Sequence, residues 1–172
     1  MVVIGIISDT HITTSNYSDI GFNLIRQLKD IFKDVNEIIH AGDISSEIFL
    51  NDLKDIAPVI CVNGHEDLLD LDRFITLKRG LYTIGVIHKQ PKDLEKFCRD
   101  NNLHILIFGH THQPLIKGTN FNTLLINPGS PTHPKAPPYK PGFKVPVPKP
   151  TVVTLIIDED NILSTYLINL KS

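Results

Sequence analysis

Tryptophan is absent from this chain of 172 residues, and cysteine is scarce, with only Cys61 and Cys98. Both cysteines lie in apolar stretches without the spacing of a thiolate metal site, so we expect them to be buried and free of a disulfide. No apolar run approaches the roughly 20 residues that a membrane-spanning helix needs. Because Met1 leads directly into a strand-like segment without a basic leader, the sequence predicts no membrane association and a place in the cytoplasm.

An excess of charge of one sign is also missing. The chain has 17 lysines and arginines against 19 aspartates and glutamates, a formal net charge of −2. Because sequence-independent nucleic-acid binders usually carry a basic field over the whole domain, we do not expect a nucleic-acid partner. The hydrophobic fraction of 41% and the charged fraction of 21% are typical of a globular protein. The length fits a single domain over residues 1–172.

Short runs rich in isoleucine and valine are typical of strands that are covered on both faces. We expect four of them to form the core of one sheet: residues 2–7, 37–40, 59–62 and 104–108. Stretches with helical periodicity lie between these runs, at residues 22–32, 48–53 and 93–100. Strand and helix therefore alternate along this part of the chain.

Shorter extended segments predict a second, more antiparallel sheet. They lie at residues 74–77, 82–87, 115–117, 123–126, 152–157 and 162–167. Two sheets packed face to face, with helices outside, would bury both sets of strands, so the expected architecture is an α/β sandwich.

Residues 131–150 form an unusual segment with eight prolines, four lysines, Tyr139 and Phe143, and no acidic residue. Proline at this density favours extended conformations and cannot join a ladder of hydrogen bonds, so the segment is predicted to be a long loop. Loops of this length are functional lids, partner surfaces or disordered segments, and the sequence leaves these alternatives open.

Carboxylates and imidazoles stand where several apolar runs stop. Separate strand ends can bring such side chains together at the carboxyl edge of an α/β sheet. Within each of the pairs Asp9 with His11 and His110 with His112, the residues are two apart, so both side chains of an extended pair point the same way. Nitrogen and oxygen ligands without thiolate favour manganese, iron, cobalt, nickel or zinc. A single pair is more often ordinary polar packing, but the whole series of segments favours metal coordination.

The motif series resembles that of the calcineurin-like metallophosphoesterases, and more narrowly that of small single-domain phosphodiesterases of bacteria and archaea. The resemblance covers nearly the whole chain and implies a four-layer αββα sandwich of two mixed β-sheets flanked by helices. The motifs are Asp-x-His at 9–11, Gly-Asp at 42–43, Gly-His-Glu-Asp at 64–67, His88, Gly-His-Thr-His at 109–112 and Asn-Pro-Gly-Ser at 127–130.

The resemblance also implies a dinuclear metal centre in which Asp43 bridges two divalent transition-metal ions. Manganese is the expected metal, with nickel, zinc, iron, cobalt and magnesium as alternatives. Two ions about 3.5–4 Å apart can hold a hydroxide between them, which implies in-line hydrolysis of a small phosphate ester, in particular a diester. The implied ligands are Asp9, His11, Asp43 and His112 for one ion and Asp43, His65, His88 and His110 for the other.

Three positions depart from the family pattern. His65 stands where the family has asparagine, and we favour His65 as the ligand over Asn63. Glu66 stands where larger members have a histidine that assists the leaving group, and a carboxylate can do so only if its pKa is raised. Lys89 replaces a glycine, so it could bind phosphate or obstruct it. The catalytic candidates are Asp43, His65 and Glu66.

Other polar residues are weaker candidates. Thr10, Lys89 and His133 are candidates for phosphate contacts, whereas His40 and His104 are expected to be packed in the fold or to lie behind the ligands. Two alternative functions remain open: a non-catalytic protein-binding scaffold similar to the retromer subunit of this fold, and a nuclease. A homodimer through the proline-rich loop or a sheet edge is also left open.

Overall fold

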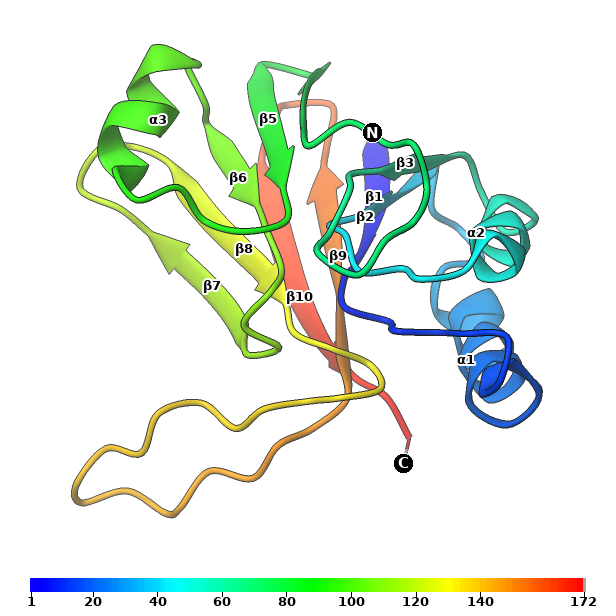
Figure 1. Ribbon diagram of the computed structural model, residues 1–172. Coiled ribbons are helices and arrows are strands. Elements are labelled where there is room, and N and C mark those ends of the chain that lie inside the picture. The colour runs from blue at the N-terminus through cyan, green and yellow to red at the C-terminus, as the bar shows by residue number, and fades with distance from the viewer. Residues whose placement is uncertain (172) are drawn as a thin grey trace.

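The computed structural model describes residues 1–171, and its ten strands form two five-stranded sheets that face each other (Figure 1). The first sheet has the strand order β10-β9-β1-β2-β3. Strand β1 pairs in parallel with β2, and β2 with β3, whereas β9 runs antiparallel to both β1 and β10. The bounds are Val2–Ile7 for β1, Glu37–His40 for β2, Val59–Cys61 for β3, Thr151–Ile157 for β9 and Leu163–Asn169 for β10.

The second sheet has the strand order β4-β5-β6-β8-β7. Its three central strands β5, β6 and β8 are parallel, and the outer strands β4 and β7 are antiparallel to their neighbours. Both sheets are therefore mixed, as predicted. The bounds are Phe74–Arg79 for β4, Tyr82–Ile87 for β5, Ile105–Ile107 for β6, Pro114–Gly118 for β7 and Leu124–Pro128 for β8.

The predicted division of strands between the sheets was wrong in two places. Strand β6 was expected in the first sheet and lies at the centre of the second, whereas β9 and β10 were expected in the second sheet and complete the first. The reason is physical: an apolar run reports that a strand is covered on both faces, and the central strands of both sheets meet that condition.

Helices cover the outer faces of the sheets, which gives the predicted four layers. Helices α1 and α2 lie outside the first sheet and α3 lies outside the second (Figure 1). The side chain of Ser46 caps α2 by accepting from the amide of Phe49, and that of Asp93 caps α3 by accepting from the amide of Lys96. The helices span Phe22–Ile31 (α1), Glu47–Lys54 (α2) and Leu94–Asp100 (α3), and a π-helical turn, Tyr17–Gly21, leads into α1.

Apolar side chains fill three spaces: one between the sheets and one under each helical layer. The layer between the sheets contains Ile6, Ile39, Ile107 and Ile126, which are almost completely buried. At Gly5, strand β1 lies so close to the ring of Phe32 that a Cβ atom at this position would be 3.0 Å from it. This packing makes the two sheets a rigid base for the loops at their edges.

The segment between β8 and β9 has no helix or strand, as predicted for the proline-rich loop. It leaves the second sheet, extends away from both sheets and returns to the first (Figure 1). Tyr139, Phe143, Val145 and Val147 are all exposed along it. Separately, none of the helices in residues 1–171 is long and apolar enough to cross a membrane.

We expect Ile39→Ala to lower the free energy of unfolding by about 2–5 kcal/mol, because it leaves a cavity between the two sheets. The matched control is Ile162→Ala at a side chain that is 62% exposed, which should change it by less than about 0.5 kcal/mol. Urea denaturation followed by circular dichroism measures both. Equal losses for the two variants would contradict the proposed location of the core.

Candidate metal centre

Most candidate ligands lie on loops that directly follow strands, with backbone in the left-handed region. The amide of Asp9 donates to the carbonyl of Gly42 over 3.0 Å, which joins the loops after β1 and β2. Left-handed backbone costs a non-glycine residue on the order of 1–3 kcal/mol and persists only where the surroundings enforce it, which is typical of functional sites. The candidate ligands with φ between 46° and 69° are Asp9, His11, Asp43, His110 and His112.

A first group of ligand atoms comes from Asp9, His11 and His112, and these atoms all lie within 4.8 Å of one another. The Nε2 atoms of His11 and His112 are 3.2 Å apart. Nε2 of His112 also lies 3.4 Å from a carboxylate oxygen of Asp9. The structure thus brings together three of the four residues that were predicted to hold one ion.

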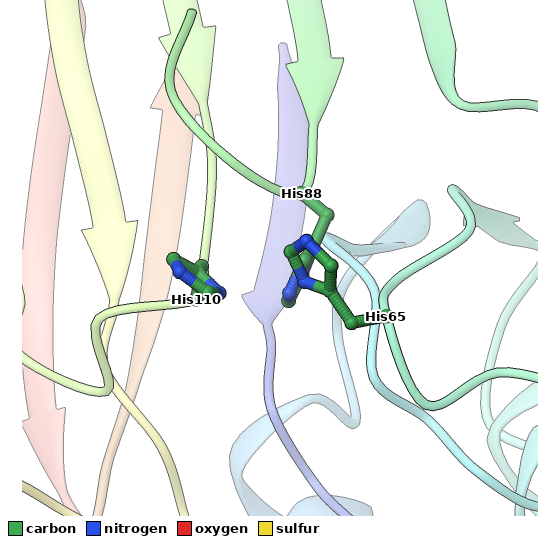
Figure 2. A group of neighbouring side chains, drawn as sticks. All are labelled: His65, His88 and His110. Atoms are coloured by element: carbon green, nitrogen blue, oxygen red, sulfur yellow. The ribbon is translucent and has the colours of Figure 1, made fainter.

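A second group consists of His65, His88 and His110, and its ligand atoms likewise lie within 4.8 Å of one another. Figure 2 shows the three rings turned toward a common point from three different loops. The ring centroids are 4.7 to 5.4 Å apart. These are the three histidines that were predicted to hold the second ion.

Asp43 lies between the two groups. Its Oδ2 is 3.2 Å from Nε2 of His88 in the second group and 3.9 Å from Nε2 of His11 in the first. Its Oδ1 accepts a hydrogen bond from the amide of Glu66 over 2.9 Å. Burial opposes ionisation of this carboxyl, but the neighbouring His88 side chain and the hydrogen bond from the Glu66 amide outweigh it and hold its pKa below the usual range. Asp43 is therefore an anion placed between two sets of donors.

Hydrogen bonds on the outer side of three rings turn Nε2 inward. Nδ1 of His88 donates to the carbonyl of Ala41 over 2.8 Å, and Nδ1 of His112 donates to the carbonyl of His133 over 2.7 Å. Nδ1 of His11 lies 2.8 Å from the carboxylate of Glu66. A histidine that binds a metal commonly donates its other ring N–H in this way, which fixes the tautomer and leaves Nε2 with a free lone pair.

The contacts of His88 indicate whether a cation would fit beside this residue. Nε2 of His88 is buried, has no hydrogen-bond partner among residues 1–171, and faces the Asp43 carboxylate. With Nδ1 donating to Ala41, a neutral ring would set its lone pair against that anion. Burial lowers the pKa of His88, but Asp43 and the Ala41 carbonyl raise it more, so positive charge is favoured at this point. A divalent cation supplies such charge, and the nitrogen and oxygen donors suit a transition metal.

Asp67 holds the loops that carry Asp43 and His65. Its carboxylate accepts from the amides of Asp43 (2.9 Å), Ser45 (2.7 Å) and Gly64 (2.7 Å). A Cβ at Gly64 would lie 2.1 Å from Oδ1 of Asp43, so only glycine fits there. This role of Asp67 was not predicted from the sequence, where its position three residues after that glycine was the available signal.

Ser130 and Thr132 hold the loop after β1 from the other side. The Ser130 hydroxyl donates to the carbonyl of Asp9 over 2.7 Å, and the Thr132 hydroxyl donates to the carbonyl of Thr10 over 2.8 Å. These contacts were also missed, because they join residues more than 120 positions apart. They tie the start of the proline-rich loop to the metal centre.

Thr10 does not face the site, contrary to its prediction as a phosphate contact. It is fully buried, and its hydroxyl accepts from Nε2 of His40 over 3.0 Å. Nδ1 of His40 accepts from the amide of Gly42 over 3.2 Å, so His40 is neutral and supports the loop beneath Asp43. Burial lowers the pKa of His40 to about 4. His104 is exposed and accepts from the amide of Thr83, outside the centre.

The remaining candidates lie around the rim of the centre. The ring centroid of His133 is 5.3 Å from that of His11. Lys89 is exposed and lines a cavity beside His65. Oδ1 of Asn63 is buried and has no hydrogen-bond partner in the part of the chain that the structure describes, so Asn63 also offers a free oxygen donor.

Two mixed sheets with helices outside bring histidines and carboxylates together at one edge. The chain belongs to the calcineurin-like phosphoesterase superfamily, whose domain model matches residues 2–145. The sequence-based assignment to this family is thereby confirmed.

Individual relatives agree with this assignment. A protein of Methanocaldococcus jannaschii named "Probable metallophosphoesterase" is 39% identical over 143 residues, which cover 79% of this chain and 71% of the relative. The structure of a novel archaeal phosphodiesterase superposes with a TM-score of 0.70 at 25% identity, covering 97% of this chain and 100% of the other. Vps29 of Entamoeba histolytica, solved in complex with zinc, gives a TM-score of 0.71 at 21% identity over 98% of this chain and 99% of the other, a likeness of fold.

We expect saturating Mn²⁺ to raise the unfolding midpoint of the metal-stripped protein by roughly 5–10 °C, because the ions bind only the folded state. Asp43→Asn should lose most of this gain, and His65→Ala should lose more of it than Asn63→Ala. Lys78→Ala, at an exposed position on β4, is the control and should keep it. Differential scanning fluorimetry gives the midpoints. A larger loss with Asn63→Ala than with His65→Ala would assign the ligand to Asn63.

The buried His40 should make the metal-free protein less stable in acid. Its pKa of about 4 in the folded state lies below the unfolded value of 6.5, so the unfolded state binds the additional proton. The contribution of His40 is complete above pH 6.5 and is lost as the pH falls to about 4, a loss of roughly 3 kcal/mol. Urea denaturation between pH 7 and 4 should show a shallower decline for His40→Gln than for the unsubstituted protein. Parallel declines would contradict a neutral buried His40.

Proposed function

We propose that this protein is a phosphodiesterase with a dinuclear metal centre. The observation that supports it best is the position of Asp43, whose Oδ2 lies near Nε2 of both His88 and His11. An anion with donors on both sides is the arrangement that a bridging carboxylate requires. The similarity to a novel archaeal phosphodiesterase supports diesters as the substrate class.

In this proposal one carboxylate and two imidazoles would hold the first ion, three imidazoles would hold the second, and Asp43 would be a ligand of both. When bound, the two ions would supply an activated water nucleophile and positive charge opposite the phosphoryl oxygens. Manganese is the metal we predict, with nickel, zinc, iron, cobalt and magnesium as alternatives. The proposed ligands are Asp9, His11, His112 and Asp43 for the first ion and His65, His88, His110 and Asp43 for the second.

In this proposal other groups of the chain orient the imidazole rings of the ligands. Glu66 accepts from Nδ1 of His11, and the carbonyls of Ala41 and His133 accept from His88 and His112, so three imidazoles keep Nε2 toward the other candidate ligands. We propose that Glu66 acts through His11 as a positioning residue. This revises its expected role as the acid that protonates the leaving group.

The predicted substrate is a small phosphoester in the cytoplasm. The net charge of −2 argues against a nucleic-acid substrate. A small diester can reach the centre because several ligands are only partly buried, including His11, His110 and His112.

A protein-binding scaffold is the second candidate function, and the proline-rich loop favours it. The loop extends from the sheets and exposes Tyr139, Phe143, Val145 and Val147, which would suit a protein partner or a second copy of the chain. The fold is similar to that of Vps29. Each predicted ligand position still has a side chain that can coordinate a metal, which favours the enzymatic function over the scaffold.

The test is hydrolysis of bis(4-nitrophenyl) phosphate and of 4-nitrophenyl phosphate by metal-stripped protein supplied with Mn²⁺, Ni²⁺, Zn²⁺ or Mg²⁺. We expect turnover only with metal, and faster turnover of the diester. Asp43→Asn and His65→Ala should lower kcat by about 100-fold or more. Each substitution removes a proposed metal ligand and thereby weakens the positive charge that would stabilise the transition state. Glu66→Gln should cost about 10- to 100-fold, as loss of an orienting partner does.

The control is again Lys78→Ala, which should keep the activity of the unsubstituted protein. If the folded protein binds metal but hydrolyses neither substrate with any of the four ions, the proposed enzymatic function is contradicted. Size-exclusion chromatography of the same samples would then show whether the chain forms a homodimer.

A further inference from the structure

A cavity of about 480 Å³ opens beside the second group of histidines. His65 and His88 line it, and the rest of its lining comes from the loop between β3 and β4, the last residue of β5 and the loop after β5. None of Asp9, His11 and His112 lines it. This volume is in the range of small-molecule sites, roughly 300–1,000 Å³, and is larger than a lone phosphate group needs.

Two cationic side chains and one carboxylate line the cavity, so its lining has a net positive charge. Arg73 and Lys89 line it, and neither forms a salt bridge within residues 1–171. The one carboxylate in its wall belongs to Asp67, which already accepts from three backbone amides. An anion that enters the cavity therefore meets two available cations.

Lys89 directly follows the candidate ligand His88 in the chain, and both residues line the cavity. The same cavity therefore contains two histidines of the second group and the two cations. Ile87, at the end of β5, adds an apolar side chain to the lining.

We propose that this cavity binds the part of the substrate that carries a second anionic group, a phosphate or a carboxylate, on Arg73 and Lys89. The inference rests on the proposed function, because it takes the scissile phosphate to lie at the metal centre. Bound divalent ions would already neutralise that phosphate, so two further cations beside it are best used by another anion. In this proposal the physiological substrate is a phosphoester that carries an additional acidic group.

Two phosphonates that differ by one carboxylate test this directly. Phenylphosphonate and 4-carboxyphenylphosphonate share the group that should bind at the metal centre, and only the second carries an anion on the opposite side of the ring. We expect protein loaded with Mn²⁺ to bind 4-carboxyphenylphosphonate about tenfold more tightly, because it gains hydrogen bonds between charged groups. Isothermal titration calorimetry measures both dissociation constants without relying on turnover.

Arg73→Gln and Lys89→Gln should each reduce this preference to about threefold or less, and the double variant should abolish it, since each removes one of the two cations. Binding of phenylphosphonate should change by less than about twofold in all three, because no group at the metal centre is altered. Lys78→Gln removes a lysine from an exposed position on β4 that does not line the cavity and should keep the full preference.

Equal binding of the two phosphonates by the unsubstituted protein would overturn this inference and leave the proposed function intact. A preference that survives in the double variant would overturn it equally. Failure of both phosphonates to bind the metal-loaded protein would overturn the inference together with the proposed function on which it rests.

Discussion

At the edge of the two sheets, ring nitrogens and a carboxylate face each other whose lone pairs would repel one another if all the rings were neutral. Nε2 of His88 lies 3.2 Å from the Asp43 carboxylate, and the Nε2 atoms of His11 and His112 are also 3.2 Å apart, while the Nδ1 atoms of all three rings are engaged on the outer side. Lone pairs at these separations require positive charge between them. The left-handed backbone at five of the candidate ligands adds a free-energy cost of its own. The remaining structure serves to hold this arrangement.

The sheets can do so because each places neighbouring parallel strands beside the same edge. Strands β1 and β2 end at the loops of Asp9 and Asp43, and β5 and β6 end at those of His88 and His110. Almost fully buried side chains fill the space between the sheets, so the four strand ends are fixed relative to one another. Asp67 and Ser130 then join the loops by hydrogen bonds to backbone groups. The ligands are thus positioned by the fold itself.

Much of this could be predicted from the sequence, because strands, helices and ligand motifs leave local patterns. The runs at β1 and β2, the three helices and the seven candidate ligands were all apparent. The pairing of strands was not, since a buried run such as β6 is compatible with the centre of either sheet. The orientation of Thr10 toward His40 and the three hydrogen bonds of Asp67 depend on contacts between distant loops, which no local pattern records.

The central claim is that Asp43 joins two metal ions, and anomalous X-ray diffraction from crystals soaked in Mn²⁺ tests it most directly. The account predicts two peaks, roughly 3.5–4 Å apart, one beside His11 and His112 and the other beside His65, His88 and His110. The Asp43 carboxylate should contact both. A single peak, or two peaks of which one lies beyond bonding distance of Asp43, would contradict the claim.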